Sequence, residues 1–293
     1  MFLGLYFFLI QDQRASFIKE GSQFIITSGV NAGIYTCISN KLSQIDNKYY
    51  IDNPIYYTPI SQETEEQLSE VADKFSRFKE APWFRTEPLD IIIGGCGGIG
   101  SWTALLLSRQ AHNLYLFDND RVEELNLGNQ LFKHSDVGEN KTQAVANTIR
   151  ELSGQDNVEQ YELYTKESIS GPIMISAFDN MSARKVMFEN WVEYVRSNPE
   201  DNCIFLDGRL SQELLQVFAV LPKDIDNYRE HLYDDSEIEE LPCGYKQTSH
   251  SAAIIGGLIT GLLSNFVSTI NENERRLLPF FTELNIPTMF MTH

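Results

Sequence analysis

A glycine-rich loop is the first segment of this sequence whose residue types and spacing could do chemistry. It reads Gly-Cys-Gly-Gly-Ile-Gly over Gly95–Gly100, directly after a continuous apolar run and at the start of a predicted helix. In such a loop Gly95 permits a tight turn, Gly97 lets the backbone approach a phosphate, and Gly100 lets the helix pack against the strand. The helix N-terminus offers N–H groups and the positive end of a dipole to an anion. We therefore predict a nucleotide site that includes Gly95, Gly97, Gly98 and Gly100.

A pair of acids follows the next predicted strand. Asp118 and Asp120 flank an asparagine at the end of that strand. An acid about 20 residues after the glycines binds ribose hydroxyls in dinucleotide-binding proteins. Up to this point a nicotinamide-dependent dehydrogenase and an ATP-binding enzyme explain the residues equally well.

The segment after Asp120 separates these two interpretations. Asn126 and Gln130 lie in it, and Lys141 opens a second predicted helix. A dehydrogenase has no need for such side chains after the ribose acid. An adenylyltransferase does need them, because it must hold a triphosphate in line with an attacking carboxylate and offset the phosphate charge.

Four motifs in this order resemble the ThiF/MoeB/HesA family of the ubiquitin-activating-enzyme-like adenylyltransferase superfamily. The family pattern is a GxGGxG loop, a DxDxVxxxNLxRQ segment, a GxxK segment, and a strand that ends in an Asp-Asn pair. The corresponding segments here are Gly95–Gly100, Asp118–Gln130, Gly138–Lys141 and Asp179-Asn180. The resemblance covers roughly residues 88–270.

The resemblance implies a role for each matching residue. Asp118 would bind the ribose of ATP, with Asp120 beside it, and Asn126 and Lys141 would contact the phosphates. Asp179, next to Asn180, would hold Mg²⁺, which prefers carboxylate and phosphate oxygens. Metal and lysine together would offset the charge that builds up as pyrophosphate leaves. The attacking substrate carboxylate is already ionised at neutral pH, so no general base is needed.

Structural interpretations stand beside these roles. Asp179 could merely cap the helix predicted from Met181. Lys141 could be a plain surface lysine, although a cation at a helix start opposes the dipole. Arg184 could be a structural salt-bridge partner.

Two departures from the family pattern bear on activity. Asn129 stands where the family has an arginine that faces the phosphates, so a cation must come from elsewhere: Arg14, Arg85, or an N-terminal arginine of a partner subunit. The paired CxxC motifs of many bacterial members are also missing, and we predict no structural zinc.

Cys243 is a candidate acceptor thiol for the activated carboxylate. It follows the acidic stretch and lies near Lys246, close to where some relatives carry such a thiol in a crossover loop. An exposed thiol near a lysine could be partly ionised and nucleophilic, although Cys243 could equally be incidental. Cys96 and Cys203 are interpreted as packing residues, and His250 as a residue that caps or packs at a helix start.

An alternation of strands and helices must position these residues. It predicts a doubly wound α/β fold with a mostly parallel, Rossmann-like sheet. The predicted strands are Leu89–Ile93, Leu114–Phe117, Val158–Tyr164, Ile173–Phe178, Cys203–Asp207, Gln216–Leu221 and a last one within Phe280–Met291. The predicted helices are Ile99–Gln110, Lys141–Leu152, Met181–Arg196 and Ser249–Ser268.

The chain is predicted to contain two parts. Residues 1–85 would form a small α+β module with strands such as Gln23–Thr27 and Tyr49–Ile51 and a helix over 62–79. By its position, this module would clamp the substrate. Residues 86–293 would form the ATP-binding domain, with an acidic, solvated crossover loop at 223–248.

Charge and apolar runs exclude other function classes. The net charge of −18, from 41 acids against 23 bases, repels a phosphate backbone, so we expect no nucleic-acid partner. The first ten residues are apolar, but they have no basic flank and no small-residue cleavage site, so we expect a buried strand rather than a membrane signal. The run Ala252–Val267 is expected to be a buried helix, because a membrane span needs about 20 mostly apolar residues. The four cysteines form no disulfide framework, which indicates a cytoplasmic protein.

The sequence thus predicts ATP- and Mg²⁺-dependent adenylation of the C-terminal carboxylate of a small ubiquitin-like or sulfur-carrier protein or a ribosomal peptide. By analogy with relatives the enzyme would be a homodimer. Two alternatives remain: a catalytically silent, E1-like binding subunit, motivated by Asn129, and a nicotinamide-dependent oxidoreductase.

Overall fold

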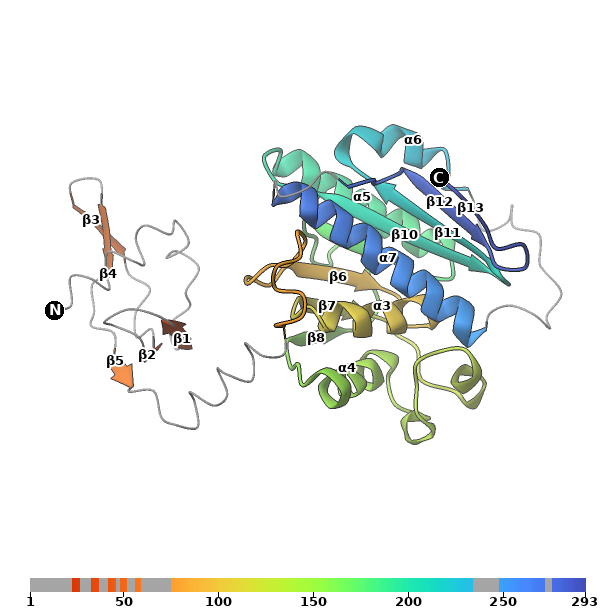
Figure 1. The fold of residues 1–293 in the computed structure, drawn as a ribbon, viewed down its shortest axis with the longest axis horizontal. Helices are drawn as coiled ribbons and strands as arrows, with labels where there is room; N and C mark the ends of the chain where they lie inside the picture. The colour runs from red at the N-terminus through yellow and green to blue at the C-terminus, as the bar shows by residue number, and fades with distance from the viewer. Residues whose placement is uncertain are drawn as a thin grey trace. The chain divides into compact units, whose positions relative to one another are not determined.

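The computed structural model divides the chain into two units between Phe78 and Lys79 (Figure 1). The structure describes residues 75–233, 248–271 and 276–293, together with five short strands between residues 23 and 58. We describe each unit by itself.

The N-terminal unit contains two small antiparallel sheets. Strands β1 (Gln23–Ile26), β2 (Gly33–Thr36) and β5 (Tyr56–Thr58) form one sheet, and β3 (Leu42–Ile45) pairs with β4 (Lys48–Ile51) in the other. Strands β1 and β4 match the two strands predicted there. The predicted helix over 62–79 lies mostly outside the described residues, and its last part, from Phe75 onward, forms turns.

The second unit is built on an eight-stranded mixed sheet, ordered β13-β12-β11-β10-β9-β6-β7-β8. Neighbouring strands from β10 to β8 are parallel, whereas β11, β12 and β13 are joined antiparallel. The strands are β6 (Asp90–Gly94), β7 (Asn113–Phe117), β8 (Val158–Tyr161), β9 (Ile173–Ser176), β10 (Ile204–Ser211), β11 (Leu214–Val220), β12 (Phe281–Asn285) and β13 (Phe290–Thr292).

The predicted α/β fold is therefore confirmed, with one error at the C-terminus. The single last strand predicted within 280–291 is a hairpin, because β12 pairs with β13 across a turn that Met289 closes with a positive φ of 50°. The parallel strands have the buried, β-branched character expected of a sheet covered on both faces, as in β6, where Ile91 and Ile93 are fully buried.

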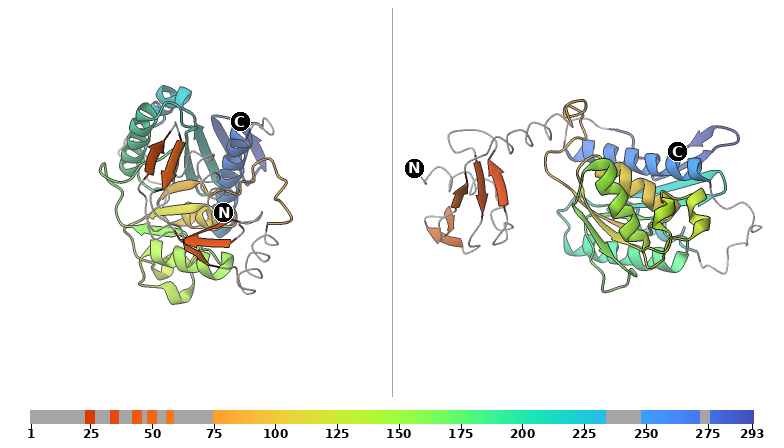
Figure 2. Two further views of the ribbon diagram at one scale, coloured as in Figure 1. Left: turned by 90° about the vertical axis from the view of Figure 1, so that its left-hand side faces the viewer. Right: turned by 90° about the horizontal axis from the view of Figure 1, so that it is seen from below.

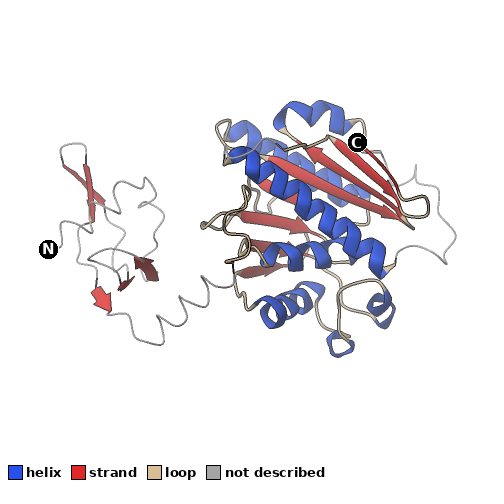
Figure 3. Ribbon diagram, viewed as in Figure 1, coloured by secondary structure: helices blue, strands red, loops and turns tan. Residues whose placement is uncertain are grey.

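Among the described residues, five α-helices cover the two faces of the sheet (Figures 2 and 3). Helix α7 lies on one side, opposite α5 and α6. The helices are α3 (Gly98–Ser108), α4 (Lys141–Ser153), α5 (Met181–Ser197), α6 (Ile225–Arg229) and α7 (Ser249–Ile270), with 3₁₀ turns η2 (Glu124–Gly128), η3 (His134–Asp136) and η4 (Pro222–Asp224).

Helix α7 packs as the core helix that the sequence predicted. Gly256 brings it close to α3, where a Cβ at this position would lie 3.0 Å from the Cβ of Trp102. Among the described residues α7 is the one helix long and apolar enough to cross a membrane, and more than half of its most apolar stretch is buried inside the structure.

The acidic crossover loop predicted at 223–248 is wrong in its first part. Residues 222–229 form η4 and α6, because Ile225 and Tyr228 lie on one helical face and pack against an aromatic core of α5 and β10. Tyr228 is fully buried there against Phe188 and Phe205. Residues 234–247, which include Cys243, lie outside the described residues.

Candidate nucleotide site

The predicted site residues meet at one edge of the sheet. Gly94, the last residue of β6, pairs with Phe117 of β7 on one side and with Ser176 of β9 on the other. Because these strands are parallel, the glycine loop, Asp118 and Asp179 all emerge at their carboxyl ends, which is where open α/β sheets bind ligands.

The glycines of the loop serve different purposes. Gly95 has a φ of +89°, and Gly100 packs so closely that a Cβ would lie 1.8 Å from the Gly95 carbonyl oxygen. A Cβ on Gly97 would meet nothing closer than 3.9 Å, where the Gln130 amide lies. The glycines at 95 and 100 thus shape the loop, whereas Gly97 leaves room above the backbone. No side chain among the described residues caps the N-terminus of α3, so its first N–H groups remain available to an anion.

Asp118 ties the loop to the second strand. Its Oδ2 accepts a hydrogen bond from the Cys96 backbone N–H at 2.7 Å, and its Oδ1 accepts one from the Asp120 N–H at 2.8 Å. Burial raises the pKa of the Asp118 carboxyl above its usual value, although the two backbone N–H groups oppose the shift. Burial also raises the pKa of the Cys96 thiol, which fits the packing role predicted for it.

Lys141 is a buried lysine held at the site. Its Nζ lies 2.8 Å from Oδ2 of Asp120, and its backbone N–H donates to the Asp120 carbonyl oxygen. The lysine side chain is 9% exposed. The alternative of a plain surface lysine is therefore wrong, because a long cationic side chain is buried in this way only where a partner holds it.

Asn126 braces the segment that covers the glycine loop. Its Oδ1 accepts a hydrogen bond from the Glu123 N–H at 2.9 Å, which caps η2, and the side chain is buried. Beyond it, Asn129 Oδ1 and Gln130 Oε1 are buried without a hydrogen-bond partner in the described part of the chain. Gln130 ends the second motif, in the segment that is expected from the sequence to hold the triphosphate. Its position over Gly97 makes it a candidate site residue.

Asp179 is exposed at the end of the loop that follows β9. The helix cap that it could have supplied is made by Asn180, whose Oδ1 accepts from the Ala183 N–H at 2.9 Å. The capping interpretation of Asp179 is therefore wrong. Among the described residues no group of three or more His, Cys, Asp or Glu side chains could hold a metal alone. A single carboxylate suits Mg²⁺ that is bound mainly through nucleotide phosphates.

Position settles two other predictions. Arg85 lies at the opposite edge of the sheet, where its Nη1 donates to Asn271 Oδ1 at 3.0 Å. There, burial and the nearby charge of Arg85 lower the pKa of His112. Arg85 therefore does not replace the missing family arginine. Thr248 rather than His250 caps α7, since the Thr248 side chain accepts from the Ser251 N–H. Arg14 and Cys243 lie outside the described residues.

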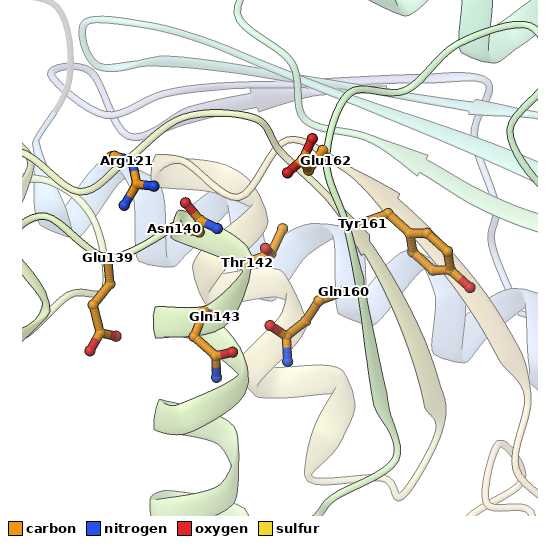
Figure 4. A pocket seen from close by; sticks show the side chains of 8 residues that line it. All are labelled: Arg121, Glu139, Asn140, Thr142, Gln143, Gln160, Tyr161 and Glu162. Atoms are coloured by element: carbon orange, nitrogen blue, oxygen red, sulfur yellow. The ribbon is translucent and has the colours of Figure 1, made fainter.

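A polar cavity of about 410 Å³ lies beside the site, near the start of α4 (Figure 4). Arg121 and Asn140 line it, and they form a β-bridge next to Asp120 and Lys141. None of the residues predicted to contact ATP lines this cavity. Figure 4 shows Gln143 and Gln160 facing each other across it, while Tyr161 turns away.

This arrangement defines a nucleotide-binding α/β domain: a glycine loop at a helix N-terminus, a ribose-type acid after the next strand, and a buried lysine beside it. The model of the ThiF family matches residues 74–293, and the chain belongs to this family.

Relatives and solved structures agree with this assignment. The chain is 27% identical over 153 residues to the ubiquitin-like modifier-activating enzyme 5 of Bombyx mori, a match that covers 43% of this chain and 39% of that protein. The chain thus spans about two-fifths or less of the curated relatives it matches.

The E. coli MccB structure with ATP is 14% identical, with a TM-score of 0.55 over 80% of this chain and 78% of that one. MccB with MccA is 13% identical, with a TM-score of 0.57 over 94% and 95% of the two chains. At these identities the likeness shows a shared fold.

Proposed function

We propose that this chain is an ATP-dependent adenylyltransferase that activates the C-terminal carboxylate of a ubiquitin-like protein or a peptide and releases pyrophosphate. The observation that carries the proposal is the connected row of Lys141, Asp120, Asp118 and the glycine loop at the carboxyl edge of the sheet. The similar proteins named as modifier-activating enzymes, and the MccB structures solved with ATP and with MccA, support the same class of reaction.

Each residue has a task in this reaction. Asp118 binds the ribose hydroxyls, and the N–H groups at the start of α3 face the phosphates. Lys141 leaves Asp120 to contact a phosphate oxygen and stabilises the charge that develops on pyrophosphate. Asp179 would hold Mg²⁺, which supplies further charge neutralisation when bound. The substrate carboxylate attacks the α-phosphorus without a general base.

Asn129 leaves the phosphate contacts one cation short of the family pattern. The family arginine is absent, and Arg85 is committed to the opposite edge of the sheet. We propose that a cation from Arg14 or from a partner subunit of a homodimer completes the phosphate contacts. The same proposal has three further parts. The acyl group is transferred to Cys243, residues 1–85 clamp the substrate, and the protein is cytoplasmic.

ATP–pyrophosphate exchange tests the reaction directly. Candidate ubiquitin-like proteins and peptides are supplied with a free C-terminus or with the same C-terminus amidated. We expect exchange with a free carboxylate only, and its loss in Lys141→Ala. Lys133→Ala is the matched control, because Lys133 forms an exposed ion pair with Glu151 away from the site and should leave exchange unchanged.

A catalytically silent binding subunit is the second candidate, and it is favoured by Asn129, which stands where the family has an arginine. Such a subunit would bind ATP but show no exchange with any substrate. Tryptophan quenching by NAD but not by ATP would instead indicate an oxidoreductase and refute both proposals.

A further inference from the structure

A buried polar network joins α6 to the loop that carries Asp179. Its centre is Asp207 of β10, which is fully buried and pairs in register with Ser176, the last residue of β9. A carboxylate this deep in the protein requires partners for both of its oxygens. The structure supplies these partners from helices α5 and α6 and from β10 itself.

Arg184 of α5 is the first partner. Its Nη1 donates to Asp207 Oδ1 and, at 3.0 Å, to the Gly208 carbonyl oxygen. Its Nη2 donates to the carbonyl oxygen of Phe178, the residue immediately before Asp179. Because the guanidinium is a rigid planar fork, the direction of one arm fixes the direction of the other. Arg184 therefore couples the orientation of Asp207 to the backbone at Asp179.

Tyr228 of α6 is the second partner, and Arg209 is the third. The Tyr228 hydroxyl donates to Asp207 Oδ2 at 2.8 Å, and Arg209 Nε donates to the same oxygen at 2.7 Å. Burial, together with the negative charge of Asp207, raises the pKa of Tyr228, so the phenol stays protonated and acts as a donor. With Oδ2 held in this way, Oδ1 is directed at Arg184.

We infer that Arg184 is a positioning residue for Asp179, and that Tyr228 acts on Asp179 through Asp207 and Arg184. The inference rests on the proposed function in one respect, since it takes Asp179 as the residue that faces Mg²⁺ bound with ATP. The packing of α6 then determines the conformation of the 177–180 backbone, and with it the position of the Asp179 carboxylate. The contacts of ATP with the glycine loop and Asp118 do not depend on α6.

Tyr228→Phe tests this coupling, because it keeps the ring packed against Phe188 and Phe205 and removes only the hydroxyl. Tyr194→Phe is the matched control. It removes a 2.6 Å hydrogen bond from Tyr194 to Asp201 near the far end of α5. ATP binding is measured by calorimetry in EDTA and across a Mg²⁺ titration, and amide hydrogen exchange is measured over residues 177–180 in the nucleotide-free protein.

In Tyr228→Phe we expect the Mg²⁺ concentration for half-maximal enhancement of ATP binding to rise about three- to tenfold, which lies within the range of one lost hydrogen bond of ordinary strength. ATP affinity in EDTA should change less than about twofold. The lost Tyr228–Asp207 hydrogen bond is not one of the proposed contacts with ATP, and those contacts stay intact. Exchange at 177–180 should be faster, and Tyr194→Phe should match the wild type. A merely structural role would weaken ATP binding equally with and without the metal.

Unchanged exchange at 177–180 together with an unchanged Mg²⁺ requirement would overturn the inference. If the wild-type protein bound no ATP, the proposed function would fail, while the exchange measurement would still decide the coupling. Should Tyr228→Phe fold poorly, Arg184→Lys serves as the second variant. A lysine keeps the charge but cannot hold Asp207 and the Phe178 carbonyl in one planar fork, so the same faster exchange is expected.

Discussion

The parallel strands of the large sheet carry polar residues at both edges, and the two edges use them differently. At the amino edge, polar side chains are occupied by backbone groups of the chain itself. Asn157 Nδ2 donates to the His112 carbonyl oxygen at 2.6 Å, and Asn271 Nδ2 donates to that of Pro82 at 2.9 Å. His112 Nδ1 accepts from the Leu89 N–H.

At the carboxyl edge, several polar groups lack such partners or have partners they can exchange. Within the described part of the chain, no side chain caps the N–H groups at the start of α3, and the Asp179 carboxylate has a hydrogen bond only with its neighbour Asn180. Lys141 pairs with Asp120, whose side chain is 59% exposed. Polar groups at the amino edge therefore stabilise the fold, whereas polar groups at the carboxyl edge remain available to bind an anion.

The buried network around Asp207 is an exception to this division. It lies at the carboxyl edge, but its polar groups are hydrogen-bonded to partners within the protein. Asp207→Asn should lower the free energy of unfolding by about 3–5 kcal/mol, since it leaves Arg184 and Arg209 buried without their counter-charge. Urea unfolding measures this value. Asp201→Asn, at an exposed carboxylate, should change it by less than about 0.5 kcal/mol, and equal losses in both variants would contradict the account.

The glycine loop offers a matched pair of substitutions that separates fold from ligand binding. Gly100→Ala should cost about 2–3 kcal/mol or more, because its Cβ would overlap the Gly95 carbonyl oxygen. Gly97→Ala should cost about 1 kcal/mol or less, since it removes only a modest capping preference at α3. We expect Gly97→Ala to weaken ATP binding about tenfold by keeping the phosphates away from the backbone. Calorimetry and thermal unfolding check both, and similar profiles for the two variants would be inconsistent with their different surroundings.

His112 gives the amino edge a pH signature. Burial, aided by the charge of Arg85, lowers its pKa from 6.5 to about 4. The folded protein then binds fewer protons than the unfolded chain between these values, so this contribution to stability is present above pH 6.5 and is lost as the pH falls towards 4. Between pH 7 and 4 the wild type should lose roughly 2–3 kcal/mol more stability than His112→Gln. Parallel pH profiles of the two proteins would rule out this assignment.

The sequence could predict the carboxyl edge better than the segments around it. The glycine spacing, the two acids and Lys141 are local patterns, and each lies where its motif required. The buried network around Asp207 could not be predicted, because Arg184, Asp207 and Tyr228 come from distant segments that only packing brings together. The sequence likewise predicts a solvated loop where α6 forms, because the short apolar face of α6 is surrounded by acidic residues.

The most direct test of the account is a calorimetric ATP titration of the wild type, Lys141→Ala and Arg85→Ala. Both variants remove one cation near the end of a parallel strand, but from opposite edges of the sheet. The account predicts that Lys141→Ala weakens ATP binding about ten- to a hundredfold, as expected for a lost charged contact. Arg85→Ala should leave ATP binding within about twofold of the wild type. Equal loss in both variants, or full binding by Lys141→Ala, would contradict a nucleotide site at the carboxyl edge.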